Sequence, residues 1–319
     1  MHAASLSHAA PLHSRFLAWI NERFPFANAL LFFILYLTTA ALVQAARGGP
    51  LQLSPVDGLA CLATWSFFLL LRVLDEHKDY QLDCHNHPQR VLQSGLITLD
   101  HLKVAGLLAV TAQLALSLWL DRGIGQATYA WLALLAWTLL MAKEFFIGEW
   151  LNRHLTWYAV SHMLVMPLLV YWLANLAQPG VRLGDELLAM MLLAFVSGFC
   201  FEITRKTKGP EEERSSIESY SRIFGTAGSA LVVMLLVSAM LANQLWLIRL
   251  LAGELPTWSL SVLGGFYLLA LWQIGRFLRA PNAKARGHNE AVVALTMLAG
   301  YAVLIGVAAQ IHGLQLNGF

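Results

Sequence analysis

The chain has 319 residues, of which 58% are hydrophobic and 13% are charged, and its formal net charge is +2. Soluble domains carry about 25% charged residues, so a deficit of this size indicates a membrane protein with several spans. The small net charge gives no sign of a nucleic-acid partner, and three widely separated cysteines exclude a disulfide framework.

The first 26 residues predict a polar, cytoplasmic tail that leads into an interfacial segment. This stretch lacks a basic start followed by an apolar run and a small-residue cleavage site, so it does not resemble a signal peptide. Residues 27–319 are expected to form one transmembrane domain.

Nine apolar segments follow, each close to the 20 or so residues that a helix needs to cross a bilayer. Helix is expected because a spanning segment must satisfy its own backbone polar groups. The chain is therefore predicted to be an all-α polytopic membrane protein, with nine transmembrane helices around a central apolar chamber. The spans are expected at 27–46, 57–74, 103–120, 127–147, 156–176, 184–203, 226–247, 257–277 and 290–311.

Basic residues divide unevenly between the two sides that these spans define. Of the 21 Lys and Arg residues, all lie on the side of the N-terminus except Arg47, Arg122, Arg182 and Arg249. The positive-inside rule then places the N-terminus and the chamber opening in the cytoplasm and the C-terminus on the opposite side, and we expect the membrane to be a bacterial inner membrane. Most acidic residues share the basic side, which suits a site that binds cations and anions together; longer loops that carry more charge would give the same bias.

The densest charge cluster, DEHKDYQLD, directly follows the second span. Its aspartates, Asp75, Asp79 and Asp83, are spaced so that on a continuous helix they fall within an arc of about 80° and a length of about 12 Å. Like charges at this spacing repel, so we expect Mg²⁺ to neutralise them, since it binds one or two carboxylates plus substrate phosphates. Arg90 follows the cluster and is expected to face a bound phosphate. The alternative is a solvated helix end whose charge Lys78 and nearby histidines offset.

The stretch LDEHKDYQLDCHNHPQRVLQSGLIT resembles the first aspartate-rich motif of the UbiA-type intramembrane prenyltransferase superfamily. The three aspartates match those of the motif, and Arg90 matches the arginine before its turn. Ser94, Gly95 and Ile97 match the segment where the next helix begins. Leu74 departs from the family, which usually has Asn there. Nine spans with a cytoplasmic N-terminus are also that family's architecture.

The resemblance implies an Mg²⁺-dependent enzyme that ionises an isoprenoid diphosphate and transfers the prenyl group to an aromatic or lipid acceptor. Asp75, Asp79 and Arg90 would then act in catalysis, and Asp83 would join the two aspartates in holding the metal. Two other outcomes stay open. The substrate's own double bonds could capture the cation, which would make the protein a terpene cyclase, or the scaffold could serve as a non-enzymatic membrane carrier.

The family's second acidic motif corresponds to GFCFEITRKTKGPEEERSSIESYSRIFG. Glu202 matches its first acidic position and is expected to help hold Mg²⁺. Lys206 stands where the family has Asp, so we expect Lys206 and Arg205 to contact the diphosphate directly. The alternative is a structural pair between Glu202 and Lys206, worth about 0.2–0.5 kcal/mol. Glu211 to Glu213 are expected to be solvated.

The connection AKEFFIGEWLNRHLTW lies on the same side and carries Lys143 and Arg153. The family places basic residues at this bend, so the resemblance implies that both contact the diphosphate. As anchors that obey the positive-inside rule, they would look identical in sequence. His162, about two turns inside the fifth span, favours a hydrogen-bonded interior residue over a catalyst.

Overall fold

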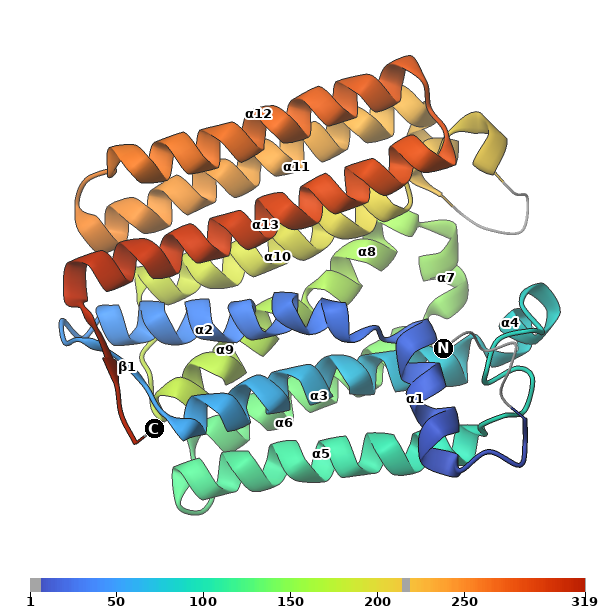
Figure 1. Cartoon of the computed structure of the whole chain (residues 1–319), viewed down its shortest axis with the longest axis horizontal. Coiled ribbons are helices and arrows are strands. Elements are labelled where there is room, and N and C mark those ends of the chain that lie inside the picture. The colour runs from blue at the N-terminus through green and yellow to red at the C-terminus, as the bar shows by residue number, and fades with distance from the viewer. Residues whose placement is uncertain (1–6, 214–218, 319) are drawn as a thin grey trace.

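The computed structural model describes residues 7–213 and 219–318, and long helices that run side by side dominate it (Figure 1). Three 3₁₀ turns, η2, η3 and η4, and two short strands, β1 and β2, complete the secondary structure. In chain order the elements are α1 Leu12–Arg23, η2 Phe26–Asn28, α2 Ala29–Ala45, β1 Leu51–Leu53, α3 Pro55–Lys78, α4 Tyr80–Asn86, α5 Leu99–Asp121, α6 Gln126–Ala142, η3 Glu144–Phe146, α7 Gly148–Arg153, α8 Leu155–Met163, α9 Val165–Ala177, α10 Asp185–Arg205, η4 Pro210–Glu212, α11 Tyr220–Ala252, α12 Thr257–Arg279, α13 Ala283–His312 and β2 Leu314–Leu316.

Each of the nine predicted spans coincides with an apolar helical segment. Within the described residues, eight segments are long and apolar enough to cross a membrane, with η2 joined to α2 and α8 joined to α9. The ninth, α6, is apolar but has only 17 residues. The predicted all-α membrane fold is therefore confirmed, whereas the described helices of spanning length number eight rather than nine.

Local sequence signals set several helix ends. At the start of α3, Ser54 and Asp57 form a capping box, which satisfies backbone N–H groups that have no partner inside the helix. The helix predicted at 156–176 is broken just before Val165. Pro167 explains this break, because a proline ring conflicts with the carbonyl four residues earlier.

The bundle closes through its last long helix. α13 packs against α2 near the start of the chain and against α10, α11 and α12. One continuous core joins α2 and α3 to α6, α8–α11 and α13, and Trp172 and Tyr36 are fully buried in it. Helices far apart in sequence therefore surround a common interior, as the predicted chamber requires.

The two strands join distant parts of the chain at one end of the bundle. β1 and β2 pair in parallel, with Leu51 opposite Leu314 and Leu53 opposite Leu316. The connection between α2 and α3 therefore lies at the same end as the segment after α13. α1, α4 and α7 lie at the other end, shown on the right of Figure 1.

The helix α1 lies across the ends of the other helices instead of along them (Figure 1). Its Trp19 and Ile20 are buried against the loop after α4, in a cluster with Val91, Leu92 and Ile97. Hydrogen bonds from Arg15 Nη1 to the Leu96 carbonyl (2.9 Å) and from the Val91 amide to the Glu22 carboxylate (3.2 Å) add polar contacts. The predicted interfacial segment is thus a helix docked on this end of the bundle.

The span predicted at 127–147 is too long, because α6 ends at Ala142. After the C-cap residue Lys143, the three residues Glu144, Phe145 and Phe146 have positive φ angles of 49°, 53° and 59°. Left-handed backbone costs a non-glycine residue roughly 1–2 kcal/mol, so the surrounding packing must hold this turn in place. An apolar pattern such as EFFIG carries no sign of such a reversal.

Candidate functional site

A cavity of about 620 Å³ lies between α2, α3, α8, α9 and α10, with contributions from α6 and α13. Its polar lining is concentrated where α3 and α10 end, close to α1. The rest of its wall is aromatic or aliphatic. The polar lining comprises Asn28, Arg72, Asp75, Lys78, Asp79, Tyr158, His162, Glu202, Arg205 and Lys206, and the apolar lining includes Phe32, Phe68, Met141, Met163, Met166, Phe201 and Met297.

Asp75 and Asp79 both line the cavity, one helical turn apart. No hydrogen bond or ion pair engages either carboxylate among residues 7–213 and 219–318. Burial raises the pKa of Asp79 above its ordinary value, Lys78 opposes that rise, and neighbouring Asp83 adds to it. The two carboxylates therefore lie near each other, and no cation or hydrogen-bond donor among the described residues pairs with either one.

The expectation of three aspartates on one continuous helix is wrong. α3 ends at Lys78, Asp79 forms its C-cap, and the chain turns before α4 begins. Asp83 consequently lies outside the cavity lining, where its Oδ2 accepts from Arg90 Nη1 at 2.8 Å and lies 3.4 Å from Arg23 Nη2. Arg90, too, is absent from the lining, so the structure brings Asp83 and Arg90 to each other rather than to Asp75.

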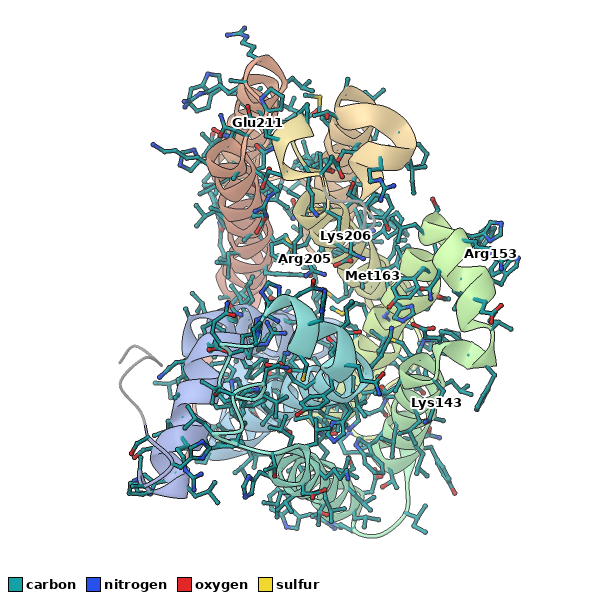
Figure 2. All side chains as sticks on the ribbon, turned by 90° about the vertical axis from the view of Figure 1, so that its right-hand side faces the viewer. Lys143, Arg153, Met163, Arg205, Lys206 and Glu211 are labelled. Carbon is teal, nitrogen blue, oxygen red and sulfur yellow. The ribbon has the colours of Figure 1, made fainter. Side chains whose placement is uncertain are left out.

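Glu202 is held by the two cations that follow it on α10. Its carboxylate lies 2.7 Å from Arg205 Nη2 and 2.9 Å from Lys206 Nζ, and all three side chains line the cavity. Figure 2, which looks onto this end of the bundle, places Arg205 and Lys206 towards its middle, near Met163. The group has one negative and two positive charges, so it carries an excess of positive charge into the cavity.

Lys143 and Arg153 do not reach the cavity. Figure 2 shows both towards the outside of the bundle, as it does Glu211. Both side chains are exposed, and Arg153 makes only a loose pair with Glu149, at 3.9 Å. Their placement matches that of membrane anchors in the alternative interpretation.

The expected solvation of Glu211 to Glu213 is wrong for two of the three residues. Glu212 pairs with Arg286 of α13 at 2.9 Å, and the Glu213 carboxylate accepts a hydrogen bond from Ser219 Oγ at 2.7 Å. Only Glu211 is exposed. The start of this loop is therefore fastened to the bundle.

Arg72, which the sequence motifs did not single out, lies in the cavity wall. Arg72 Nη2 and Arg23 Nε both lie 2.6 Å from Oε1 of Glu76, a fully buried carboxylate. This bridge ties α1 to α3 and fixes the guanidinium of Arg72 beside the site. The available signal was the i, i+4 spacing of Arg72 and Glu76 at the end of an apolar span.

A second missed group surrounds Lys78. Its Nζ lies 2.7 Å from Glu144 Oε1 and donates to Tyr158 Oη at 2.7 Å. Glu144 belongs to the left-handed turn η3, so the unusual backbone there carries a carboxylate to the site. Lys206 Nζ lies 5.5 Å from the centre of the Tyr158 ring on the same side. Tyr158 therefore contacts cations from both α3 and α10.

The carboxylates suit a metal that is completed by its substrate rather than a preformed metal cage. Across the described residues, no group of three or more His, Cys, Asp or Glu side chains could hold a metal ion by itself. Mg²⁺ usually takes one or two carboxylates and completes its shell with water and phosphate oxygens. Two unpaired carboxylates one turn apart, with four cations around the same cavity, fit that pattern.

Comparison with known families identifies the family of the chain. The model of the UbiA prenyltransferase family matches residues 34–290, which is most of the chain. The chain belongs to the UbiA prenyltransferase family. The matched range includes every charged residue of the cavity lining. A comparison with curated proteins finds no match.

Two solved structures of this family's fold are similar to the chain. One comes from a study of digeranylgeranylglyceryl phosphate synthase in membranes, with 15% identity, a TM-score of 0.64, and coverage of 93% of this chain and 99% of the other. The second is a UbiA homologue from Aeropyrum pernix K1 without ligand, with 16% identity, a TM-score of 0.63, and coverage of 85% and 97%. At these identities the likeness establishes the shared fold of this UbiA family member and nothing finer.

Proposed function

We propose that this protein is an Mg²⁺-dependent prenyltransferase that ionises an isoprenoid diphosphate and transfers the prenyl group to an aromatic or lipid acceptor. The observation that carries the proposal is the division of the cavity. Its polar end combines two unpaired carboxylates with four cations, and the rest of its wall is apolar. A diphosphate with a hydrocarbon tail has the same two parts.

In the proposed complex, Arg72, Arg205 and Lys206 contact the diphosphate and orient it. Fixed cations stabilise negative charge as it develops on a leaving group without a large reorganisation. Asp75 and Asp79 would hold Mg²⁺, which supplies further charge neutralisation when it is bound. Glu202 keeps Arg205 and Lys206 in place and is a candidate further ligand.

The apolar part of the cavity would hold the prenyl chain and keep water from the cation that forms when the carbon–oxygen bond breaks. Its aromatic wall includes Phe32 and Phe68, whose rings stack with their centres 3.9 Å apart. Aromatic faces attract cations, and methionine side chains adapt to an irregular ligand. We propose that the polar end faces the cytoplasm of a bacterial inner membrane, since the basic residues of the chain gather there.

The proposal can be tested with the full-length protein in lipid nanodiscs, C10 to C20 prenyl diphosphates and Mg²⁺. We expect diphosphate release that requires Mg²⁺ and a prenylated product once an acceptor, such as a phenol or a glycerolipid alcohol, is added. Cyclic hydrocarbons without acceptor would instead identify a terpene cyclase. Binding without any diphosphate release would contradict both enzymes and support a carrier.

A further inference from the structure

His162 lies at the boundary between the two parts of the cavity. It lines the cavity from α8, four residues after Tyr158, which corresponds to a rise of about 6 Å. Tyr158 contacts Lys78 at the polar end, and Met163 and Met166 follow His162 in the apolar wall. A diphosphate at the polar end would bring its first prenyl carbon to this boundary.

The structure also fixes which ring nitrogen of His162 is free. Nδ1 lies 2.8 Å from the carbonyl oxygen of Tyr158, which can only accept, so Nδ1 carries the hydrogen of the neutral ring. Ser161 Oγ, 3.3 Å from Nδ1, also donates to that carbonyl. Nε2 therefore has an open lone pair, and no hydrogen bond to it occurs within the described parts of the chain.

Two aromatic contacts hold the ring in this orientation. The Tyr158 ring stacks on it with centres 3.9 Å apart and planes 13° apart. Phe145, from the left-handed turn η3, meets it edge to face with centres 6.0 Å apart. The bond from Nδ1 to the carbonyl four residues earlier is not special by itself, because His154 makes the same bond to Trp150 at 2.8 Å. His154 is exposed and outside the cavity, so of these two histidines it is His162 that presents its Nε2 to a ligand in the cavity.

We propose that Nε2 of His162 is the general base of the reaction, and that the acceptor is a neutral nucleophile with a proton on its reacting atom, such as a hydroxyl or an aromatic C–H. This inference rests on the proposed function. The carbon–oxygen bond of the prenyl diphosphate breaks and its electron pair leaves with the diphosphate. The acceptor forms a bond to the prenyl carbon, and its proton moves to Nε2. The proton passes to water after the product has left.

Charged and titratable groups near His162 come from several elements. They are Lys78 from α3, Lys206 from the end of α10 and Glu144 from η3. Tyr158 lies against the ring itself. A general base must be neutral at the start of the reaction, and in the neutral ring Nε2 carries the open lone pair.

The test separates ionisation from proton removal. The probe is farnesyl diphosphate that carries ¹⁸O in the bridge between its first prenyl carbon and the phosphorus. It is incubated with Mg²⁺, first with water alone as the nucleophile and then with 4-methylphenol added. If ionisation is reversible, the label moves from the carbon–oxygen–phosphorus bridge to the non-bridging oxygens of the same phosphate, and this movement is the scrambling that is measured. Net release of diphosphate requires in addition that the cation is trapped and that a proton is lost. The ratio of release to scrambling therefore reports the base.

The informative variant is His162→Asn, whose amide N–H can replace the Nδ1 donor but which offers no base. We expect scrambling to persist and the ratio of release to scrambling to fall about 10²–10⁴-fold, the usual contribution of a general base. His154→Asn, which changes the equivalent bond outside the cavity, should leave the ratio unchanged. An unchanged ratio in His162→Asn, or scrambling without any release by the unaltered protein with both nucleophiles, would overturn the proposal.

A variant that fails to fold does not end the test, because the unaltered protein gives a second readout. Its ratio of release to scrambling should hold at neutral pH and fall at acidic pH, where the imidazole takes up a proton. A ratio that stays unchanged down to the pH at which the protein unfolds would contradict a histidine base. If the proposed function itself fails, the unaltered protein shows neither scrambling nor release. That outcome differs from the loss of release alone.

Discussion

The two acidic regions that meet in the cavity differ in their partners. Asp75 and Asp79, at the end of α3, have no ion-pair partner among the described residues, and Glu202, at the end of α10, has two, Arg205 and Lys206. The first region is negative and needs a cation from outside, whereas the second supplies its own cations and has positive charge left over. The comparison teaches that matching carboxylates to a motif does not give their role, because the neighbours decide the net charge that a ligand meets.

The largest effect is expected at the first region. Asp75→Asn should lower Mg²⁺-dependent diphosphate release about 10²–10³-fold, since one preorganised charge is lost from the site. Release is measured with a prenyl diphosphate at saturating Mg²⁺. Asp100→Asn, at an exposed carboxylate outside the cavity, serves as control and should retain activity. A fully active Asp75→Asn protein would contradict the metal role.

A charge reversal at the second region sharpens the contrast. Lys206→Asp removes a cation that is proposed to contact the diphosphate and introduces the acidic residue that the resemblance to the family implies at this position. We expect KM for the prenyl diphosphate to rise about 10-fold at low Mg²⁺, as the loss of a charge-assisted hydrogen bond would give, and to recover partly at high Mg²⁺.

Lys206→Met is the matched comparison, because it loses the cation without gaining a carboxylate. Its KM should rise to a similar extent but should not recover as Mg²⁺ increases. Equal Mg²⁺ dependence in the two variants would mean that the second region does not bind metal in either form.

The smallest effect is expected in stability. Burial raises the pKa of Asp79 above its value in the unfolded chain, so the folded protein binds this proton more tightly. Stability from this group is present at low pH and is lost as pH rises through the raised pKa. Without Mg²⁺, the melting temperature should therefore fall over that range by an amount on the order of 1–2 °C.

Two further measurements check this explanation. Asp79→Asn should reduce the pH dependence, and Mg²⁺ with inorganic diphosphate should raise the melting temperature of the unaltered protein at neutral pH more than that of the variant. A melting temperature of the unaltered protein that does not change with pH would contradict an unpaired Asp79.

The spans were predictable because length and hydropathy determine them one segment at a time. Even the start of the segment at 226–247 agrees with a kink at Gly225, whose φ of 70° interrupts α11. The break at Asp79 was not predictable, since no glycine or proline marks it. The separation of Asp83 from Asp75 follows from that break and from Arg90 and Arg23, which capture the Asp83 carboxylate.

The part of the site that depends on distant contacts was also beyond the sequence. Arg72 gains its place through Glu76 and Arg23, and Arg23 lies on a helix predicted only as an interfacial segment. Glu144 reaches Lys78 because the backbone makes a left-handed turn there. The apolar pattern predicted that the helix would continue through these residues. Other site residues lie at the ends of their predicted spans, so the hydropathy pattern and the topology are enough to bring them to one end of the bundle. These residues are Asp75, Asp79, Glu202, Arg205 and Lys206.

The ribbon formed by β1 and β2 has a consequence for how the molecule is made. β1 is synthesised early but remains unpaired during synthesis, because its partner strand β2 leaves the ribosome only after α13. Leu51 can therefore pair with Leu314 only after the intervening helices have been synthesised and have packed so that both ends meet. A chain interrupted before residue 314 would leave the backbone of β1 as an open edge that can pair with other chains. The β1–β2 pair therefore forms only in a chain that is complete through β2, at the end of the bundle opposite the proposed active site.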